Sequence, residues 1–137
     1  MNRTLFAPLA VALGLTLAGC AGSTQGAAAP AAAIAPLDGT SYEVTLAFPG
    51  ESPMKDTLRF AGGRFESTAC TAVGFPQWSD YDAKVEPGAI EFSVLAKSAD
   101  GTTMDWKGTV KGGNVEATAV RTMSGKTSTA SVSGVKR

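Results

Sequence analysis

Apolar and polar residues alternate in segment after segment between residues 41 and 136, and this period of two constrains the fold more than any other feature. In the first of these segments Tyr42, Val44 and Leu46 form one side of the pattern, with polar residues between them. A period of two with one polar side is typical of half-buried antiparallel strands. No segment after residue 40 shows the 3.6-residue period of an amphipathic helix. The sequence therefore predicts an all-β domain.

Eight such segments are joined by connections, several of which are short and contain glycine. Strands on short connections pair with their neighbours in up-and-down order, and closing such a sheet removes its two exposed edges. We therefore expect an eight-stranded antiparallel up-and-down barrel, with a two-sheet sandwich as the alternative. A barrel of this size has either a packed interior or room for one small ligand. The expected strands are about 41–48, 55–60, 64–70, 80–86, 89–97, 103–111, 114–123 and 127–136.

The two ends of this barrel differ in the length of their connections. At one end we expect tight turns that contain glycine, and at the other end mostly longer loops, of which residues 71–79 form the longest. Longer loops on a rigid scaffold are where binding usually takes place. The first strand begins and the last strand ends at the tight-turn end, so we expect the long loops to lie away from Leu37.

The N-terminus has the pattern of a secretory signal peptide. Arg3 is the only charged residue before a run of fourteen mostly apolar residues, 5–18, and small residues end the run. As a helix this run is about 21 Å long, which is shorter than the roughly 20 residues that cross a bilayer core. We therefore expect cleavage, with an uncleaved transmembrane anchor as the alternative.

The sequence LAGC at residues 17–20 resembles the lipobox of bacterial lipoprotein precursors. The resemblance implies that Cys20 receives a diacylglyceryl group and becomes the mature N-terminus after cleavage behind Gly19. Two or more lipid chains anchor a protein stably to a membrane. A small residue follows Cys20 where Asp would favour the inner membrane, so the resemblance implies the periplasmic face of the outer membrane.

A segment rich in alanine separates the lipobox from the expected barrel. Residues 21–36 carry no charge, and Pro30 and Pro36 interrupt any helix. We expect a flexible tether whose typical reach is roughly 20–24 Å. The chain then divides into a signal peptide, a lipidated cysteine with its tether, and a barrel domain, at residues 1–19, 20–36 and 37–137.

Composition excludes several kinds of chemistry. The chain has no His, which removes Ser-His-Asp triads, Cys-His pairs and ordinary His-containing zinc sites. Its 12 basic and 12 acidic residues balance, so no basic surface for nucleic acid is expected. Asp80 and Asp82 share the polar side of one strand, where solvated carboxylates are expected. We therefore expect no catalytic residue, metal or cofactor, with an enzyme that uses carboxylates alone as the alternative.

Lipidation of Cys20 leaves Cys70 without an intramolecular disulfide partner. A single thiol in an oxidising compartment is typically buried and inert, and the alternatives are an intermolecular or a reactive role.

Aromatic residues are the candidate contacts for a ligand or partner. In the 71–79 loop, Phe75 and Trp78 either cover the end of the barrel or form an aromatic rim for a ligand or protein. Tyr42, Phe92 and Trp106 project inward, where they either build the core or contact a ligand. Small inward residues on the last strands leave a cavity or match large residues opposite, and the sequence does not separate the two.

The body of the chain resembles small lipocalin-like barrels of bacterial envelope lipoproteins, and also the META domain of heat-inducible envelope proteins. The resemblance rests on LDGTSYEV, DTLRFAGGRFESTAC and GAIEFSVLAKSADGTTM within residues 37–104, and residues 105–137 depart from it as further hairpins. It implies a barrel without a defined activity. We expect a non-enzymatic lipid-anchored barrel that binds a small apolar ligand or an envelope component through its long-loop end. The alternative is a protein inhibitor, of the lysozyme-inhibitor kind, or another protein-interaction module of the periplasm.

Overall fold

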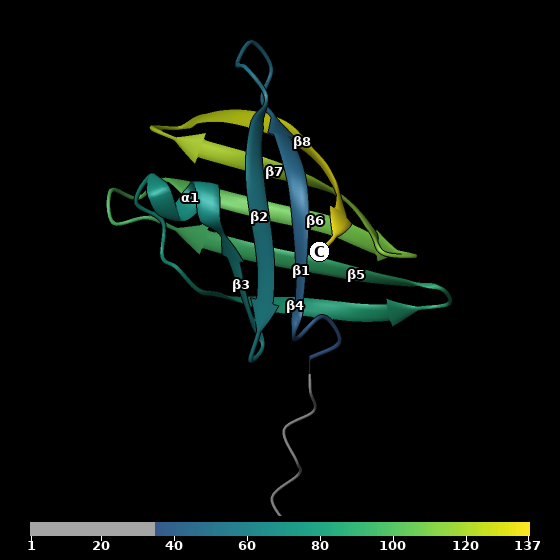
Figure 1. Ribbon diagram of the computed structural model, residues 1–137. Coiled ribbons are helices and arrows are strands. Elements are labelled where there is room, and N and C mark those ends of the chain that lie inside the picture. The colour runs from purple at the N-terminus through teal and green to yellow at the C-terminus, as the bar shows by residue number, and fades with distance from the viewer. Residues whose placement is uncertain (1–34) are drawn as a thin grey trace, which may run out of the picture. The chain divides into compact units, whose positions relative to one another are not determined.

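A computed structural model describes residues 35–137, so the expected signal peptide, Cys20 and most of the tether lie outside the described residues. Residues 35–137 form a closed barrel of eight antiparallel strands in up-and-down order (Figure 1). The expected all-β barrel is confirmed, and the two-sheet sandwich is not formed. The strands are β1 (Thr40–Ala47), β2 (Met54–Ala61), β3 (Arg64–Ser67), β4 (Ser79–Glu86), β5 (Ala89–Lys97), β6 (Thr103–Lys111), β7 (Asn114–Met123) and β8 (Lys126–Lys136).

One expected strand is wrong in its second half. β3 ends at Ser67 instead of residue 70, and the helix α1 (Thr68–Ala72) follows it directly. Ser67 has an extended backbone, and its side chain accepts a hydrogen bond from the Cys70 N–H at 3.1 Å, which is the geometry of a helix N-cap. A five-residue helix is too short to show a 3.6-residue period, so the pattern did not reveal it.

The interior of the barrel is filled by inward side chains, most of which are large. Six aromatic rings form one connected cluster, with centroids of contacting pairs 5.0–6.2 Å apart, and Trp106 in this cluster is fully buried. A Cβ added at Gly108 would lie 2.6 Å from both the Phe92 ring and the Ala117 side chain. The small inward residues of β6 and β7 therefore make room for Phe92. The cluster consists of Tyr42, Phe60, Phe65, Tyr81, Phe92 and Trp106.

Residues 35–39 cover the tight-turn end of the barrel. Leu37 is buried there, and its N–H donates to the Tyr81 hydroxyl at 3.2 Å. The Tyr81 hydroxyl in turn donates to Asp38 at 3.0 Å, and Asp38 accepts the N–H of Gly63 from the β2–β3 turn. The long connections lie at the opposite end of the strands from Leu37, as expected.

Two seams of the barrel leave one strand without a neighbouring strand or helix over part of its length. β3 pairs with β4 only through Arg64–Asp80 and Phe65–Ser79, so β4 runs on past the β2–β3 turn. β8 meets β1 only from Ser131 onward. The β4–β5 hairpin consequently extends away from β3, as Figure 1 shows.

Candidate functional site

The long-loop end of the barrel is closed by its own side chains. Phe48 and Phe75 are both buried there. The Arg121 guanidinium lies 4.2 Å from the centre of the Phe48 ring, and its Nη2 donates to Glu51 Oε1 at 2.5 Å. The burial of Phe75 agrees with the first of its two expected roles, in which it covers the end of the barrel.

The buried carboxylate of Asp56 on β2 holds α1 in place. Its Oδ2 accepts the Ser67 hydroxyl at 2.6 Å, and its Oδ1 accepts the Thr68 hydroxyl and the Ala69 N–H, each at 2.9 Å. Oδ1 also accepts the N–H of Thr57 at 2.7 Å. Four donors satisfy this carboxylate, so it links β2 to the start of α1 across eleven or more residues of sequence.

Cys70 lies on the buried side of α1, next to the Ser67 side chain. Burial raises the pKa of the Cys70 thiol to about 11. The thiolate is the reactive form of cysteine, so a raised pKa together with burial makes this side chain unreactive at neutral pH. The geometry agrees with the buried, inert interpretation of Cys70.

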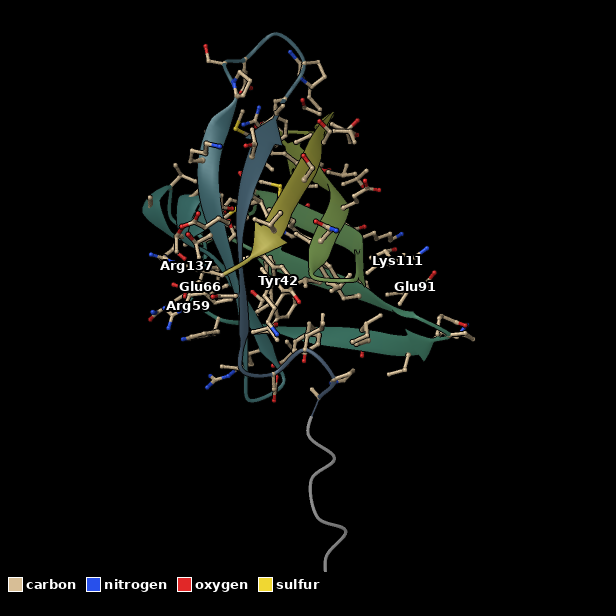
Figure 2. The ribbon with its side chains drawn as sticks, turned by 45° about the vertical axis from the view of Figure 1, so that its right-hand side comes forward. Tyr42, Arg59, Glu66, Glu91, Lys111 and Arg137 are labelled. Atoms are coloured by element: carbon tan, nitrogen blue, oxygen red, sulfur yellow. The ribbon has the colours of Figure 1, made fainter. Side chains whose placement is uncertain are left out.

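Trp78 lies in neither of its expected places. Its half-buried ring contacts two guanidinium groups from the outward side of the barrel wall, with Arg59 at 5.5 Å and Arg64 at 5.9 Å from the ring centre. Arg59 Nη1 also contacts Glu66 Oε2 at 3.0 Å (Figure 2). The Glu66 side chain is 5% exposed and that of Arg59 is 51% exposed. Arg59 and Arg64 were not predicted as contacts, because alternation gives the side of a strand but not its neighbours.

The three inward aromatic candidates belong to the core. Tyr42, Phe92 and Trp106 are all buried in the ring cluster, and Figure 2 shows Tyr42 within the barrel. The indole N–H of Trp106 has no acceptor among the described residues. The structure thus brings Tyr42, Phe92 and Trp106 together in one cluster, buries Phe75 in the connection between α1 and β4, and places Trp78 outside the wall.

Exposed aliphatic side chains surround the closed long-loop end. Val73, just after α1, is 72% exposed. Three further large apolar side chains are exposed near the loop ends of their strands, and only Val85 and Val135 among the described residues are comparably exposed near the other end. This group of four, called here the apolar rim, consists of Met54, Val73, Leu95 and Met123.

A groove of about 770 Å³ crosses the outward side of β4–β7. Its floor is formed by residues whose side chains point inward, Ala83, Phe92, Gly108 and Ala117, and two rows of polar side chains border it. Three acidic and two basic side chains stand in these rows, so the groove has no strongly predominant charge. The charged residues are Asp82, Lys84, Glu91, Lys107 and Glu116.

Within residues 35–137, no three His, Cys, Asp or Glu side chains are grouped as metal ligands would be. Over the same residues, no helix combines the length and the apolar character that crossing a bilayer requires. Comparison with protein-family models, curated proteins and solved structures gives no match to this chain.

Proposed function

We propose that this chain is a non-enzymatic, lipid-anchored barrel of the bacterial envelope that binds an envelope protein through its long-loop end. The anchoring part rests on the resemblance of residues 17–20 to a lipobox. The binding part rests on the barrel. A protein partner is favoured over a small apolar ligand for the reasons that follow.

The filled interior is the observation that carries this choice. A ligand inside the barrel would have to displace part of the aromatic cluster around Trp106, which is fully buried. It would also have to pass Phe75 or the Arg121–Glu51 ion pair at the long-loop end. Ligand sites are usually formed before the ligand arrives, whereas contacting aromatic rings occupy this part of the interior.

The apolar rim supplies a surface that a protein partner would cover. Met54, Leu95 and Met123 lie on three different strands near this end of the barrel, and Val73 lies in the loop that follows α1. Contiguous or clustered apolar side chains at a surface mark interaction sites more often than single ones do. The closed end beneath them is held by α1 and the Arg121–Glu51 pair, so the surface is already ordered before binding.

Native mass spectrometry and tryptophan fluorescence with a lipid panel test the exclusion of a ligand. We expect the purified chain to carry no additional mass. We also expect its fluorescence to stay unchanged when fatty acids or phospholipids are added, because Trp106 is fully buried within the ring cluster. A co-purified lipid, or a saturable change in fluorescence, would refute the protein-partner proposal.

Site-specific photo-crosslinking in the native cell tests the surface. A photoreactive residue in place of Val73 is expected to give a discrete crosslinked protein, and Met123→Lys is expected to weaken that band. Lys107 on the barrel wall is the matched exposed control position. Equal crosslinking from positions 73 and 107 would contradict a partner at the long-loop end.

Cell fractionation tests the anchor. Cys20→Ser is expected to move the protein from the membrane to the soluble periplasmic fraction, whereas Cys70→Ser is the control that leaves fractionation unchanged. Retention of Cys20→Ser in the membrane would refute anchoring through this residue.

A further inference from the structure

The outer edge of β4 has no neighbouring strand beyond Tyr81 among the described residues. β3 pairs with β4 at Ser79 and Asp80 only, and the last contact along this edge is the Tyr81 N–H to the Gly63 carbonyl, at 3.2 Å. β5 pairs with the other edge of β4 as far as Glu86. Residues 82–86 therefore form a strand that is paired on one side and open on the other.

The hairpin geometry identifies the backbone groups along this open edge. Glu86 and Ala89 close the two-residue turn Pro87-Gly88, and the closing pair of such a hairpin is hydrogen-bonded. Glu86, Lys84 and Asp82 therefore direct their N–H and C=O groups to β5. Ala83 and Val85, between them, direct theirs away from β5, in the same direction as the Tyr81 N–H that reaches Gly63.

The side chains along the edge also form a readable pattern. Asp82, Lys84 and Glu86 point outward, with charges that alternate negative, positive, negative, and Lys84 contacts Glu86 as an ion pair. Ala83 and Val85 point to the inward side, and Val85 is 68% exposed because the hairpin extends beyond the body of the barrel. An added strand would meet charged side chains on one side and apolar side chains on the other.

We propose that the free edge of β4 at residues 82–86 binds an extended segment of another polypeptide as an additional antiparallel strand. Ala83 and Val85 would each exchange N–H and C=O hydrogen bonds with the segment, as in other cases of strand addition. Opposite charges across a strand pair are favourable, so the segment carries basic, acidic and basic residues opposite Glu86, Lys84 and Asp82. Its intervening residues are apolar and lie beside Val85 and Ala83. This inference uses the opposite end of the barrel from the apolar rim and is independent of the lipid anchor.

The charges argue against two other occupants of the edge. If two copies paired so that Ala83 of each faced Val85 of the other, all four outward backbone groups of each edge would be used. That register sets Lys84 against Lys84, and Asp82 against Glu86, so like charges repel. A register centred on Val85 would pair Lys84 with Glu86, but it would set Ala83 against Pro87, which has no N–H to donate. The chain's own N-terminal segment has no charged residue between Arg3 and Asp38, so it offers nothing opposite Lys84.

The unpaired part of β8 at the β1–β8 seam is a weaker candidate for the same role. β8 has no β1 neighbour over residues 126–130. Its exposed side chains there are Lys126, Thr127 and Thr129, without an exposed apolar residue to pack against. Natural proteins usually give open strand edges polar or charged side chains that prevent pairing with another chain, and this part of β8 fits that description.

Amide hydrogen exchange and a peptide titration, both followed by NMR on the purified full chain, test the proposal. In the free protein the amides of Ala83 and Val85 are expected to exchange rapidly, while those of Lys84 and Glu86 are protected by β5. The peptide TKVEVKT is then expected to shift the Ala83 and Val85 amides and slow their exchange. The charge-reversed peptide TEVKVET is the control and is expected to bind about ten-fold more weakly.

Val85→Pro removes one outward N–H without touching the bonds to β5, because proline lacks this donor. It is expected to abolish binding of TKVEVKT, whereas Val85→Thr, which keeps the N–H and the shape, is expected to bind within about three-fold of the wild type. Thermal melting of both variants verifies that the barrel is intact. If the melting temperature of Val85→Pro is far below that of the wild type, Ala83→Pro provides the same test, because Ala83 is the other residue whose N–H points away from β5.

Four results would overturn the proposal. These are slow exchange of the Ala83 and Val85 amides in the free chain, no shift with millimolar TKVEVKT, peptide shifts that map elsewhere, and unchanged binding by a folded Val85→Pro variant. A concentration-dependent dimer that protects these amides would assign the edge to a second copy and would also overturn it. None of these outcomes affects the proposed binding at the long-loop end, which the crosslinks from position 73 report.

Discussion

Replacement of Asp56 by Ala tests whether one buried carboxylate holds the long-loop end in place. The change removes the acceptor for the Ser67 hydroxyl, the Thr68 hydroxyl and the Ala69 N–H. The Thr57 N–H, the fourth donor, keeps the Thr68 hydroxyl oxygen as an acceptor at 3.2 Å. A buried donor left without a partner costs about 1–3 kcal/mol. The exposed Thr68 hydroxyl can turn to water, which leaves the Ser67 hydroxyl and the Ala69 N–H uncompensated. We therefore expect Asp56→Ala to lower the free energy of unfolding by about 3–5 kcal/mol.

Two matched variants separate this mechanism from a general effect of charge. Asp56→Asn keeps one acceptor oxygen and nearly the same volume, so we expect a loss of only about 1–2 kcal/mol. Asp82→Ala removes an exposed carboxylate from the outward side of β4, and we expect a change within about 0.5 kcal/mol. Urea titrations followed by tryptophan fluorescence and circular dichroism measure all three values.

The same variant reports on α1 itself through the thiol of Cys70. In a Cys20→Ser background Cys70 is the only thiol, and wild-type labelling by a disulfide reagent at pH 8 is expected to be slow because the thiol is buried. A loss of about 3 kcal/mol in the stability of α1 raises the open fraction, and so the labelling rate, about 100-fold. Asp56→Ala with unchanged labelling, and stability within about 1 kcal/mol of the wild type, would refute the role assigned to this carboxylate.

Three further predictions concern the barrel wall and its core. In Gly134→Ala the added Cβ would lie 2.0 Å from the Glu43 carbonyl oxygen at the β1–β8 seam, so we expect a loss of about 3 kcal/mol or more, against about 0.5 kcal/mol or less for Ser133→Ala, by urea unfolding. Burial raises the pKa of Cys70 from 9.0 to about 11, and burial with the Asp38 hydrogen bond raises that of Tyr81 from 10.0 to about 12. Above pH 9 the unfolded chain releases these protons while the folded barrel keeps them, so stability falls from about pH 9 to about pH 12. Cys70→Ala is expected to remove the part of this fall between about pH 9 and pH 11, and an identical pH profile of the unfolding midpoint would contradict the assignment. Trp78→Phe leaves Trp106 as the only tryptophan, and we expect acrylamide to quench its fluorescence only weakly because Trp106 is fully buried. Strong quenching in this variant would show that the barrel opens readily.

The period of two made the core predictable. Phe92 and Trp106 fall on the inward side because alternation fixes the side of a strand from the sequence alone, and the burial of both follows. The same alternation also predicts that the Asp56 side chain points inward. Counting back by twos from the buried Phe60 and Leu58 places this carboxylate inward, where a charged group needs several donors.

The surroundings of Trp78 and the presence of α1 were not predictable in the same way. Both depend on contacts between strands, and no local pattern encodes such contacts. Trp78 lies beside Arg59 and Arg64 because the β2–β3 and β3–β4 registers bring these side chains together. α1 is held by the hydrogen bonds that it donates to Asp56 on another strand, and its five residues are too few to show a helical period in the sequence.

The open edge of β4 follows from closure of the barrel itself. Strands in a closed barrel are tilted and staggered, so the hairpins cannot all end at the same level. Here the stagger is concentrated at two seams, where β3 meets β4 through two residue pairs and β8 meets β1 only from Ser131. A sheet that closes to remove its edges thus keeps two short ones, at opposite ends. The edge at β8 carries polar and small side chains, whereas the edge at β4 combines alternating charges with the exposed Val85. If strand stagger alone explained both edges, the side chains of both would be equally suited to prevent pairing with another chain. The contrast between the two edges is therefore the reason to look for a partner at β4.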